Sequence, residues 1–195
     1  MKENDMNIDA AEQFIIDELS RKLPENLYYH GLHHSLDVTR AALILASQEG
    51  ITDQESLDLL KTAALYHDSG FMIIYQSHEE AGCKIIKNVL PDFGYANVQI
   101  DIICGMIMAT KLPQNPQTHL EKILCDADLD YLGRDDYEPI AHTLFLELFA
   151  RNLIADAEYW NVMQIKFLGS HQYWTDSARK NRDEVKQRHL LGLMK

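Results

Sequence analysis

Histidines and carboxylates that flank apolar segments are the residues of this chain best suited to chemistry. His67 and Asp68 are adjacent and end a segment whose apolar residues recur with helical spacing. Upstream, His30 and His34 lie four residues apart, on one face if that turn is helical. Downstream, residues 125–130 read Cys-Asp-Ala-Asp-Leu-Asp. Imidazole and carboxylate groups together bind divalent metal ions, which make water a nucleophile near neutral pH, so the pattern predicts a metal centre for hydrolysis.

Three features of this pattern stay open at the level of the residues. Asp128 is the first choice for the carboxylate from the last segment, and Asp126 replaces it if the helix there begins later. The structural alternative is a buried His67 that is hydrogen-bonded to a neighbour and binds no ion. Mixed ligands of this kind suit Mn²⁺, Fe²⁺, Zn²⁺, Ni²⁺ or Mg²⁺, so the identity of the metal is open.

Helical periodicity covers most of the chain and predicts the elements that must carry these residues. The segment before His67 opens with Thr52 or Asp53 as its cap, and Ser77 with Glu80 has the form of a capping box. Period-2 alternation is absent, so we expect an all-α fold without a sheet. The other helices are expected over residues 9–22, 32–48, 77–89, 96–110, 120–132, 139–154, 157–168 and 175–193.

Composition limits the classes of protein to which the chain can belong. Its 195 residues, of which 46% are hydrophobic, can bury one sizeable core. The formal charge of −12 disfavours binding to a nucleic acid duplex. Three cysteines without CxxC spacing indicate buried free thiols. Because no apolar stretch could span a membrane and the polar start, residues 1–9, lacks the apolar core of a signal peptide, we expect a cytoplasmic protein without membrane attachment.

The order of these motifs resembles the HD superfamily of metal-dependent phosphohydrolases. Residues 29–38 resemble its first-histidine motif, Y-H-x-x-x-H-x-x-x-V, and the pattern H…HD…D continues to Asp128. The resemblance implies that His34, His67, Asp68 and Asp128 bind the metal. It also implies a single-domain, all-α helical bundle over residues 1–195, with the motif core at about 29–132 and C-terminal helices, 139–193, packed on it.

The resemblance further implies hydrolysis of a phosphomonoester or phosphodiester, which we expect to be small and nucleotide-like. His30 would face the substrate as a catalytic residue beside Asp68, and Glu79 is the other candidate for moving the proton or orienting water. Phosphate oxygens would be bound by cations or histidines. The candidates for this role are Lys111, His78 and Arg134.

Departures from the family pattern leave a second interpretation open. Members with two metals add histidines between the HD pair and the last Asp, whereas residues 108–111 here read Met-Ala-Thr-Lys, which favours a single ion. Thr110 at this place motivates the alternative of a metal- or nucleotide-binding domain with a regulatory or scaffold role and little turnover. Aromatic residues between Tyr159 and Trp174 are interpreted as core or subunit packing, compatible with a homodimer, rather than as a base-stacking platform.

Overall fold

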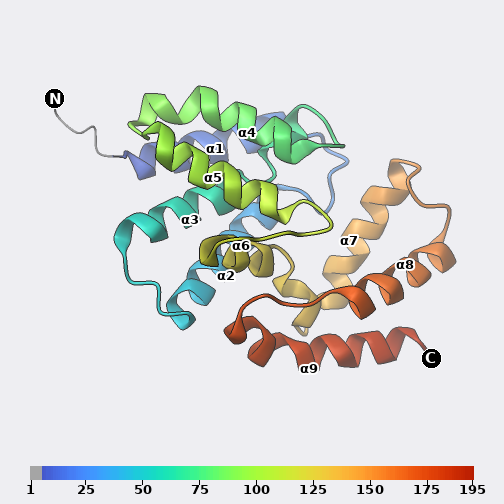
Figure 1. Cartoon of the computed structure of the whole chain (residues 1–195). Coiled ribbons are helices and arrows are strands. Elements are labelled where there is room, and N and C mark those ends of the chain that lie inside the picture. The colour runs from blue at the N-terminus through green and yellow to red at the C-terminus, as the bar shows by residue number, and fades with distance from the viewer. Residues whose placement is uncertain (1–5) are drawn as a thin grey trace.

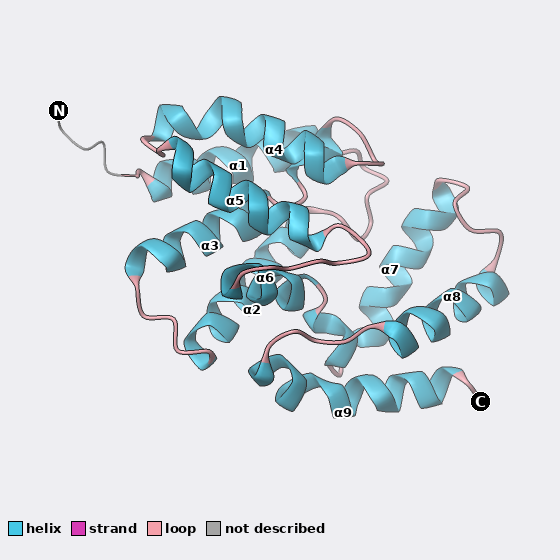
Figure 2. Ribbon diagram, in the orientation of Figure 1, coloured by secondary structure: helices cyan, strands magenta, loops and turns pink. Residues whose placement is uncertain are grey.

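Nine α-helices and three short 3₁₀ helices follow one another in the computed structural model, which describes residues 6–195. Residues 1–5, part of the polar start considered above, lie outside the described residues. Over residues 6–195 there is no strand (Figure 2), which confirms the all-α prediction. The α-helices are α1 (Ile8–Lys22), α2 (Leu32–Gln48), α3 (Gln54–Tyr66), α4 (His78–Val89), α5 (Asn97–Thr110), α6 (His119–Asp128), α7 (Tyr137–Ala150), α8 (Ala157–Ser170) and α9 (Asp176–Leu193). The 3₁₀ helices are η1 (Ser69–Met72), η2 (Leu90–Phe93) and η3 (Asp130–Gly133). None of the described helices combines the length and the apolar character that crossing a bilayer requires.

Side chains cap the first turn of some helices, α3 among them, but not of α4. Asp53 accepts a hydrogen bond from the Ser56 backbone N–H at the start of α3, as the sequence predicts. The predicted capping box at Ser77 is wrong, because Ser77 has a φ of 58° and its side chain makes no capping hydrogen bond. Glu80, the expected partner in that box, instead pairs with Lys111. The left-handed turn at Ser77 lets α4 start immediately after the loop that follows η1.

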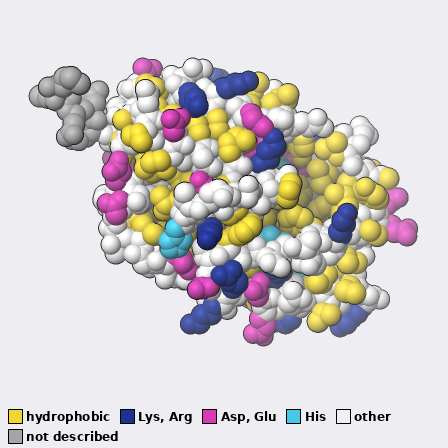
Figure 3. Space-filling view, in the orientation of Figure 1, with side chains coloured by type: hydrophobic (Ala, Val, Ile, Leu, Met, Phe, Trp, Pro, Cys, Tyr) yellow, Lys and Arg dark blue, Asp and Glu magenta, His cyan; other side chains and the backbone are white. Residues whose placement is uncertain are grey.

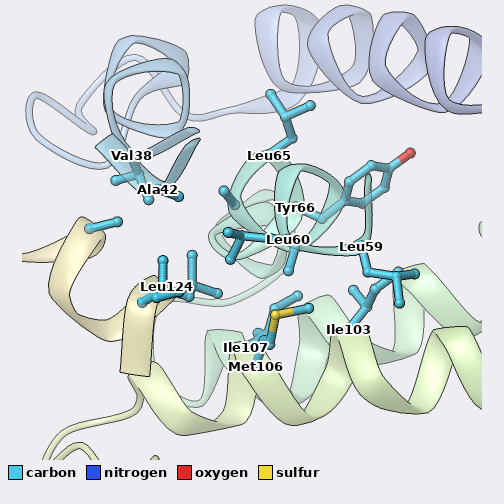
Figure 4. Close-up of a cluster of buried hydrophobic side chains, with 14 of the residues drawn as sticks. Val38, Ala42, Leu59, Leu60, Leu65, Tyr66, Ile103, Met106, Ile107 and Leu124 are labelled. Carbon is cyan, nitrogen blue, oxygen red and sulfur yellow. The ribbon is translucent and has the colours of Figure 1, made fainter. Parts of the chain in front are cut away.

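Helix α3 runs through the centre of the main core (Figures 1 and 4). Its side chains Leu60 and Tyr66 are fully buried, and it packs against α1, α2, α5 and α6. Ile103 and Ile107 of α5 cover one side, and Leu124 of α6 lies nearby. Burial of each such side chain stabilises the fold by about 1.5–3 kcal/mol. The packing fixes the C-terminal end of α3, where His67 and Asp68 follow.

A second, smaller core joins η3 to the last three helices. Tyr131 and Leu132 of η3 pack with Tyr137 of α7 and Leu168 of α8. Helices α7 to α9 therefore lie together on one side of the molecule (Figure 1). The division into a motif core and attached C-terminal helices within one domain stays a prediction.

Two carboxylates that flank Asp128 fasten the end of α6 to α9. Asp126 accepts hydrogen bonds from the backbone N–H groups of Trp174 and Thr175, both at 2.8 Å, and from the Thr175 hydroxyl at 2.7 Å. Asp130 binds the Arg182 guanidinium through both oxygens, at 2.7 and 3.1 Å. The C-terminal helix thus fixes the backbone on both sides of Asp128.

His171, between α8 and α9, makes the stability of the fold depend on pH. Burial and the neighbouring Lys186 ammonium lower the pKa of its imidazole to about 4, although Asp183 opposes this shift. In the unfolded chain, this imidazole therefore takes up a proton near pH 6.5, whereas in the folded chain it is protonated only near pH 4. Stability therefore rises with pH across this window. Through His171, acidification from pH 7 to pH 5 should lower the free energy of unfolding by about 2 kcal/mol.

Urea unfolding at pH 7 and pH 5 measures this cost when wild type is compared with His171→Gln. The variant should lose about 2 kcal/mol less than wild type on acidification, because Gln does not titrate. An equal loss in both proteins would contradict the assignment to His171.

Candidate metal centre

Four side chains from three parts of the chain converge at the C-terminal end of α3. His34 lies on α2, His67 ends α3, Asp68 leads into η1, and Asp128 ends α6. The first three offer ligand atoms that all lie within 4.8 Å of one another. Asp128 borders the same space, because its Oδ1 lies 3.1 Å from His34 Nε2 and 3.4 Å from His67 Nε2. Asp126, the alternative to Asp128, has both oxygens engaged at the start of α9 instead.

The hydrogen bonds of these residues fit a bound cation. His67 Nδ1 lies 2.8 Å from the Ala64 carbonyl oxygen, which can only accept, so Nδ1 carries a proton and Nε2 is the nitrogen that faces the cluster. His67 Nε2 and Asp68 Oδ2 are buried without a hydrogen-bond partner, and they lie 3.3 Å apart. Buried acceptors that face one another need a proton or a metal ion between them. His67 therefore differs from a structural histidine, in which both ring nitrogens have hydrogen-bond partners.

The pKa shifts within the cluster also indicate a site that favours a cation. Burial alone lowers the pKa of the His67 imidazole, but the carboxylates of Asp68 and Asp128 outweigh it and hold this pKa well above its ordinary value. Burial raises the carboxyl pKa of Asp68 and of Asp128, yet the neighbouring imidazoles hold both well below the usual range. The site thus stabilises positive charge in the interior of a chain whose net charge is −12.

His30 lies before α2 rather than on it, so its expected place on one helical face with His34 is wrong. Helix α2 begins at Leu32, and Gly31 is its N-cap. His30 still belongs to the same cavity as Asp68 and Asp128. Its ring centroid lies 4.4 Å from that of Phe71 and 6.0 Å from that of His34.

Glu147 of α7 holds His30 in this position and is a residue that the sequence interpretation missed. Its carboxylate is fully buried and accepts the backbone N–H groups of Tyr29 and His30, at 2.9 and 3.1 Å. His30 Nδ1 lies 2.5 Å from Glu147 Oε1, and the Tyr75 hydroxyl donates to the same oxygen at 2.8 Å. Burial raises the pKa of this carboxyl, but the hydrogen bonds from His30 and the backbone outweigh it and lower the pKa below its ordinary value.

The remaining candidate residues separate into those that reach the cavity and one that does not. His78 stacks on Phe71 at 3.9 Å between ring centroids, and its Nε2 lies 3.4 Å from Asp68 Oδ1. Glu79 and Lys111 line the same cavity, although the Lys111 ammonium pairs with Glu80. The structure does not bring Arg134 there.

The guanidinium of Arg134 is occupied by other carboxylates. Its Nη1 lies 2.6 Å from Asp37 Oδ2, and its Nη2 lies 2.6 Å from Asp136 Oδ2. Arg134 lines a different hollow, between α2 and α9. A role in binding phosphate at the metal centre therefore does not fit its position.

Gly70 allows α4 to approach η1 and thereby brings His78 to Asp68. A Cβ at this position would lie 1.8 Å from the His78 carbonyl oxygen and 2.8 Å from the Gly82 backbone nitrogen. Gly70→Ala should therefore lower the unfolding free energy by about 3 kcal/mol or more, because backbone must move to relieve the overlap. Urea unfolding measures this loss.

Gly192→Ala is the matched control, since a Cβ on Gly192 meets nothing within 4 Å. This substitution should leave stability unchanged or raise it by up to about 1 kcal/mol, because alanine favours a helix. Equal stability of the two variants would contradict the close approach at Gly70.

A cavity of about 470 Å³ opens beside the four-residue cluster. Asp68, Asp128, His30 and His78 line its polar end, and side chains of α7 and α8 form much of its apolar wall. This volume lies in the range of small-molecule sites, about 300–1,000 Å³. The arrangement can therefore place a small ligand against a metal ion and a histidine that is able to transfer a proton.

Comparisons with known proteins agree with this fold and motif. The family model described as HD domain matches residues 31–130, slightly more than half of the chain. No curated protein matches the sequence.

Solved structures from several bacteria share the fold over almost the whole chain. A predicted HD superfamily hydrolase from an uncultured Thermotogales bacterium is 20% identical, with a TM-score of 0.59, over 95% of this chain and 88% of its own. The Lin1889 protein of Listeria innocua is 22% identical, with a TM-score of 0.63, over 97% of both chains. The YpgQ protein of Bacillus subtilis, solved in complex with ADP, is 19% identical, with a TM-score of 0.62, over 96% of both chains.

Proposed function

The chain belongs to the HD-domain family, and from this premise we propose that it is a metal-dependent phosphohydrolase acting on a small, nucleotide-like phosphate ester. The observation that carries the proposal is the buried group His34, His67 and Asp68, in which His67 Nε2 and Asp68 Oδ2 face one another without hydrogen-bond partners. Asp128 completes the proposed set of metal ligands. The divalent ion would supply a water molecule of lowered pKa and a positive charge for the phosphate.

The side chains around the proposed ligands would transfer the proton and bind the phosphate during hydrolysis. His30 transfers the proton to the leaving oxygen, because Glu147 fixes its Nδ1 and leaves Nε2 as the nitrogen for the substrate. Glu79 is the alternative proton carrier, since its carboxylate is buried in the cavity wall. His78 and Lys111 bind phosphate oxygens, and Lys111 exchanges its partner Glu80 for the phosphate when substrate enters.

Two observations support a nucleotide-like substrate. The cavity is large enough for one, and the structurally similar YpgQ protein was solved with ADP. Thr110, where two-metal members of the family carry histidine, favours a single ion in this chain. The same residue keeps a second candidate open, a regulatory domain that binds metal or nucleotide with little turnover. The cytoplasmic location and the homodimer stay predictions.

Metal analysis combined with a substrate panel tests the proposal. The protein would be purified, its metal content measured after separate loading with Mn²⁺, Fe²⁺, Ni²⁺, Zn²⁺ and Mg²⁺, and phosphate release followed with nucleoside mono-, di- and triphosphates. About one ion per chain with metal-dependent hydrolysis is expected. One ion with tight nucleotide binding but no hydrolysis would favour the regulatory candidate. The absence of any bound ion would contradict the hydrolase, and the absence of both ion and nucleotide binding would contradict the regulatory candidate as well.

A further inference from the structure

The cavity beside the metal centre continues into an uncharged, largely apolar space between α7 and α8. We call this space the α7–α8 arm, lined by Leu144, Leu148, Trp160, Met163, Gln164 and Phe167. None of these side chains carries a charge, whereas the polar end of the same cavity holds Asp68, Asp128, His30 and His78. One continuous cavity thus offers two different chemical environments.

The arm exists because α7 and α8 pack on other elements rather than closely on each other. Helix α7 rests on η3, and α8 lies along α9, so the two helices diverge (Figure 1). The space-filling view shows hydrophobic side chains gathered in a shaded hollow beside these helices (Figure 3). An apolar hollow that opens to solvent and leads to a reaction centre is typical of a small-molecule site.

We propose that the α7–α8 arm binds a flat, uncharged ring system, such as the base of a nucleotide, while the phosphate lies at the metal centre. This inference rests on the proposed function and specifies its substrate class. Trp160 and Phe167 are half-buried and line the arm, and aromatic side chains of this kind are the groups on which a flat ring stacks. A sugar phosphate without a base would leave these faces uncovered and would bind less well.

Gln164 gives the arm one polar group that can form a hydrogen bond with the edge of the ring. The Tyr137 hydroxyl donates to Gln164 Oε1 at 2.7 Å, which leaves the amide N–H groups as donors. A ring nitrogen or an exocyclic carbonyl oxygen would accept from this amide. A single polar group in an apolar wall fixes the orientation of a ligand without demanding a charge on it.

Intrinsic fluorescence tests the proposal without requiring turnover. The chain holds two tryptophans, and Trp174 lies outside the cavity with its indole N–H donating to Gln114. In a Trp174→Phe background, Trp160 therefore becomes the sole reporter. Titration of the metal-loaded protein with adenosine 5′-monophosphate should quench or shift its emission, while ribose 5-phosphate, which lacks the base, should bind at least about 10-fold more weakly.

Kinetics in the otherwise native chain provide the second measurement. Trp160→Ala should raise KM for the nucleotide about 10- to 100-fold with a small effect on kcat, and should leave KM for ribose 5-phosphate unchanged. Tyr159→Ala is the matched control, because Tyr159 is the neighbouring aromatic residue of α8, is 52% exposed and does not line the cavity.

The possible outcomes separate this inference from the proposed function. Equal affinity of the two ligands in the fluorescence titration would overturn the inference, and so would hydrolysis that Trp160→Ala leaves unchanged. Base-dependent binding without hydrolysis of any phosphate ester would overturn the hydrolase assignment but support the role of the arm.

Discussion

Replacing His67 by alanine is expected to remove both metal binding and hydrolysis while leaving the helical fold in place. His67 Nε2 lies 3.3 Å from Asp68 Oδ2 and 3.4 Å from Asp128 Oδ1, at the centre of the proposed ligand set. Loss of a residue that only supports a ligand typically costs 10- to 100-fold in metal affinity or activity. Loss of a ligand should therefore cost at least about 100-fold in each. Metal content and phosphate release measure the two effects, and circular dichroism monitors the helices.

His142→Ala is the control for His67→Ala. His142 is also a histidine, but it lies on the exposed surface of α7 outside the cavity. This variant should keep its metal and its activity. If His67→Ala keeps the metal content and the hydrolysis rate of wild type, the proposed metal centre is not the site of the reaction.

Glu147→Gln is expected to lower kcat about 10- to 100-fold by releasing His30 from its fixed orientation. The carboxylate accepts His30 Nδ1 and three other donors, whereas an amide presents only one acceptor oxygen. Unfolding free energy should also fall by about 1–3 kcal/mol, because buried donors lose their partner. Steady-state kinetics over a range of pH and urea unfolding measure the two effects.

The pH dependence separates a positioning role of Glu147 from a purely structural one. If Glu147 orients His30, the pH profile of kcat changes in Glu147→Gln, while the metal content stays that of wild type. Glu147→Asp should restore part of kcat, because it keeps the carboxylate, and Glu138→Gln, at an exposed position of α7, should behave like wild type. Lower stability with an unchanged kcat and pH profile would limit Glu147 to a structural role.

Helix positions and the order of the main motifs were predictable because both depend on local sequence. Residues 32–48 match α2, since the helix ends just before Gly50, which has a φ of 75°. The segment predicted as one helix over residues 120–132 is instead divided at Leu129 into α6 and η3. The division follows from tertiary contacts, in which Tyr131 and Leu132 turn into the smaller core and Asp130 binds Arg182. Such contacts leave no periodic signal in the sequence.

Long-range pairing explains where the prediction of the site fell short. Arg134 looked free to bind phosphate, but Asp37, 97 residues earlier, occupies it. Glu147 is 117 residues from His30, and its only local signal is a single carboxylate within the apolar run of residues 139–149. Trp160 and Phe167 pack against the smaller core, as expected from the sequence, and they also line the cavity. Their place in the cavity wall depends on how α7 and α8 diverge, which no local pattern encodes.

Anomalous scattering from crystals grown with Mn²⁺, combined with elemental analysis of the same preparation, tests the central claim most directly. We expect one strong peak within about 2.0–2.3 Å of His34 Nε2, His67 Nε2 and carboxylate oxygens of Asp68 and Asp128. Elemental analysis should then give about one ion per chain. A peak elsewhere, or an ordered cluster of these four side chains without any peak, would contradict the metal centre and with it the proposed hydrolase.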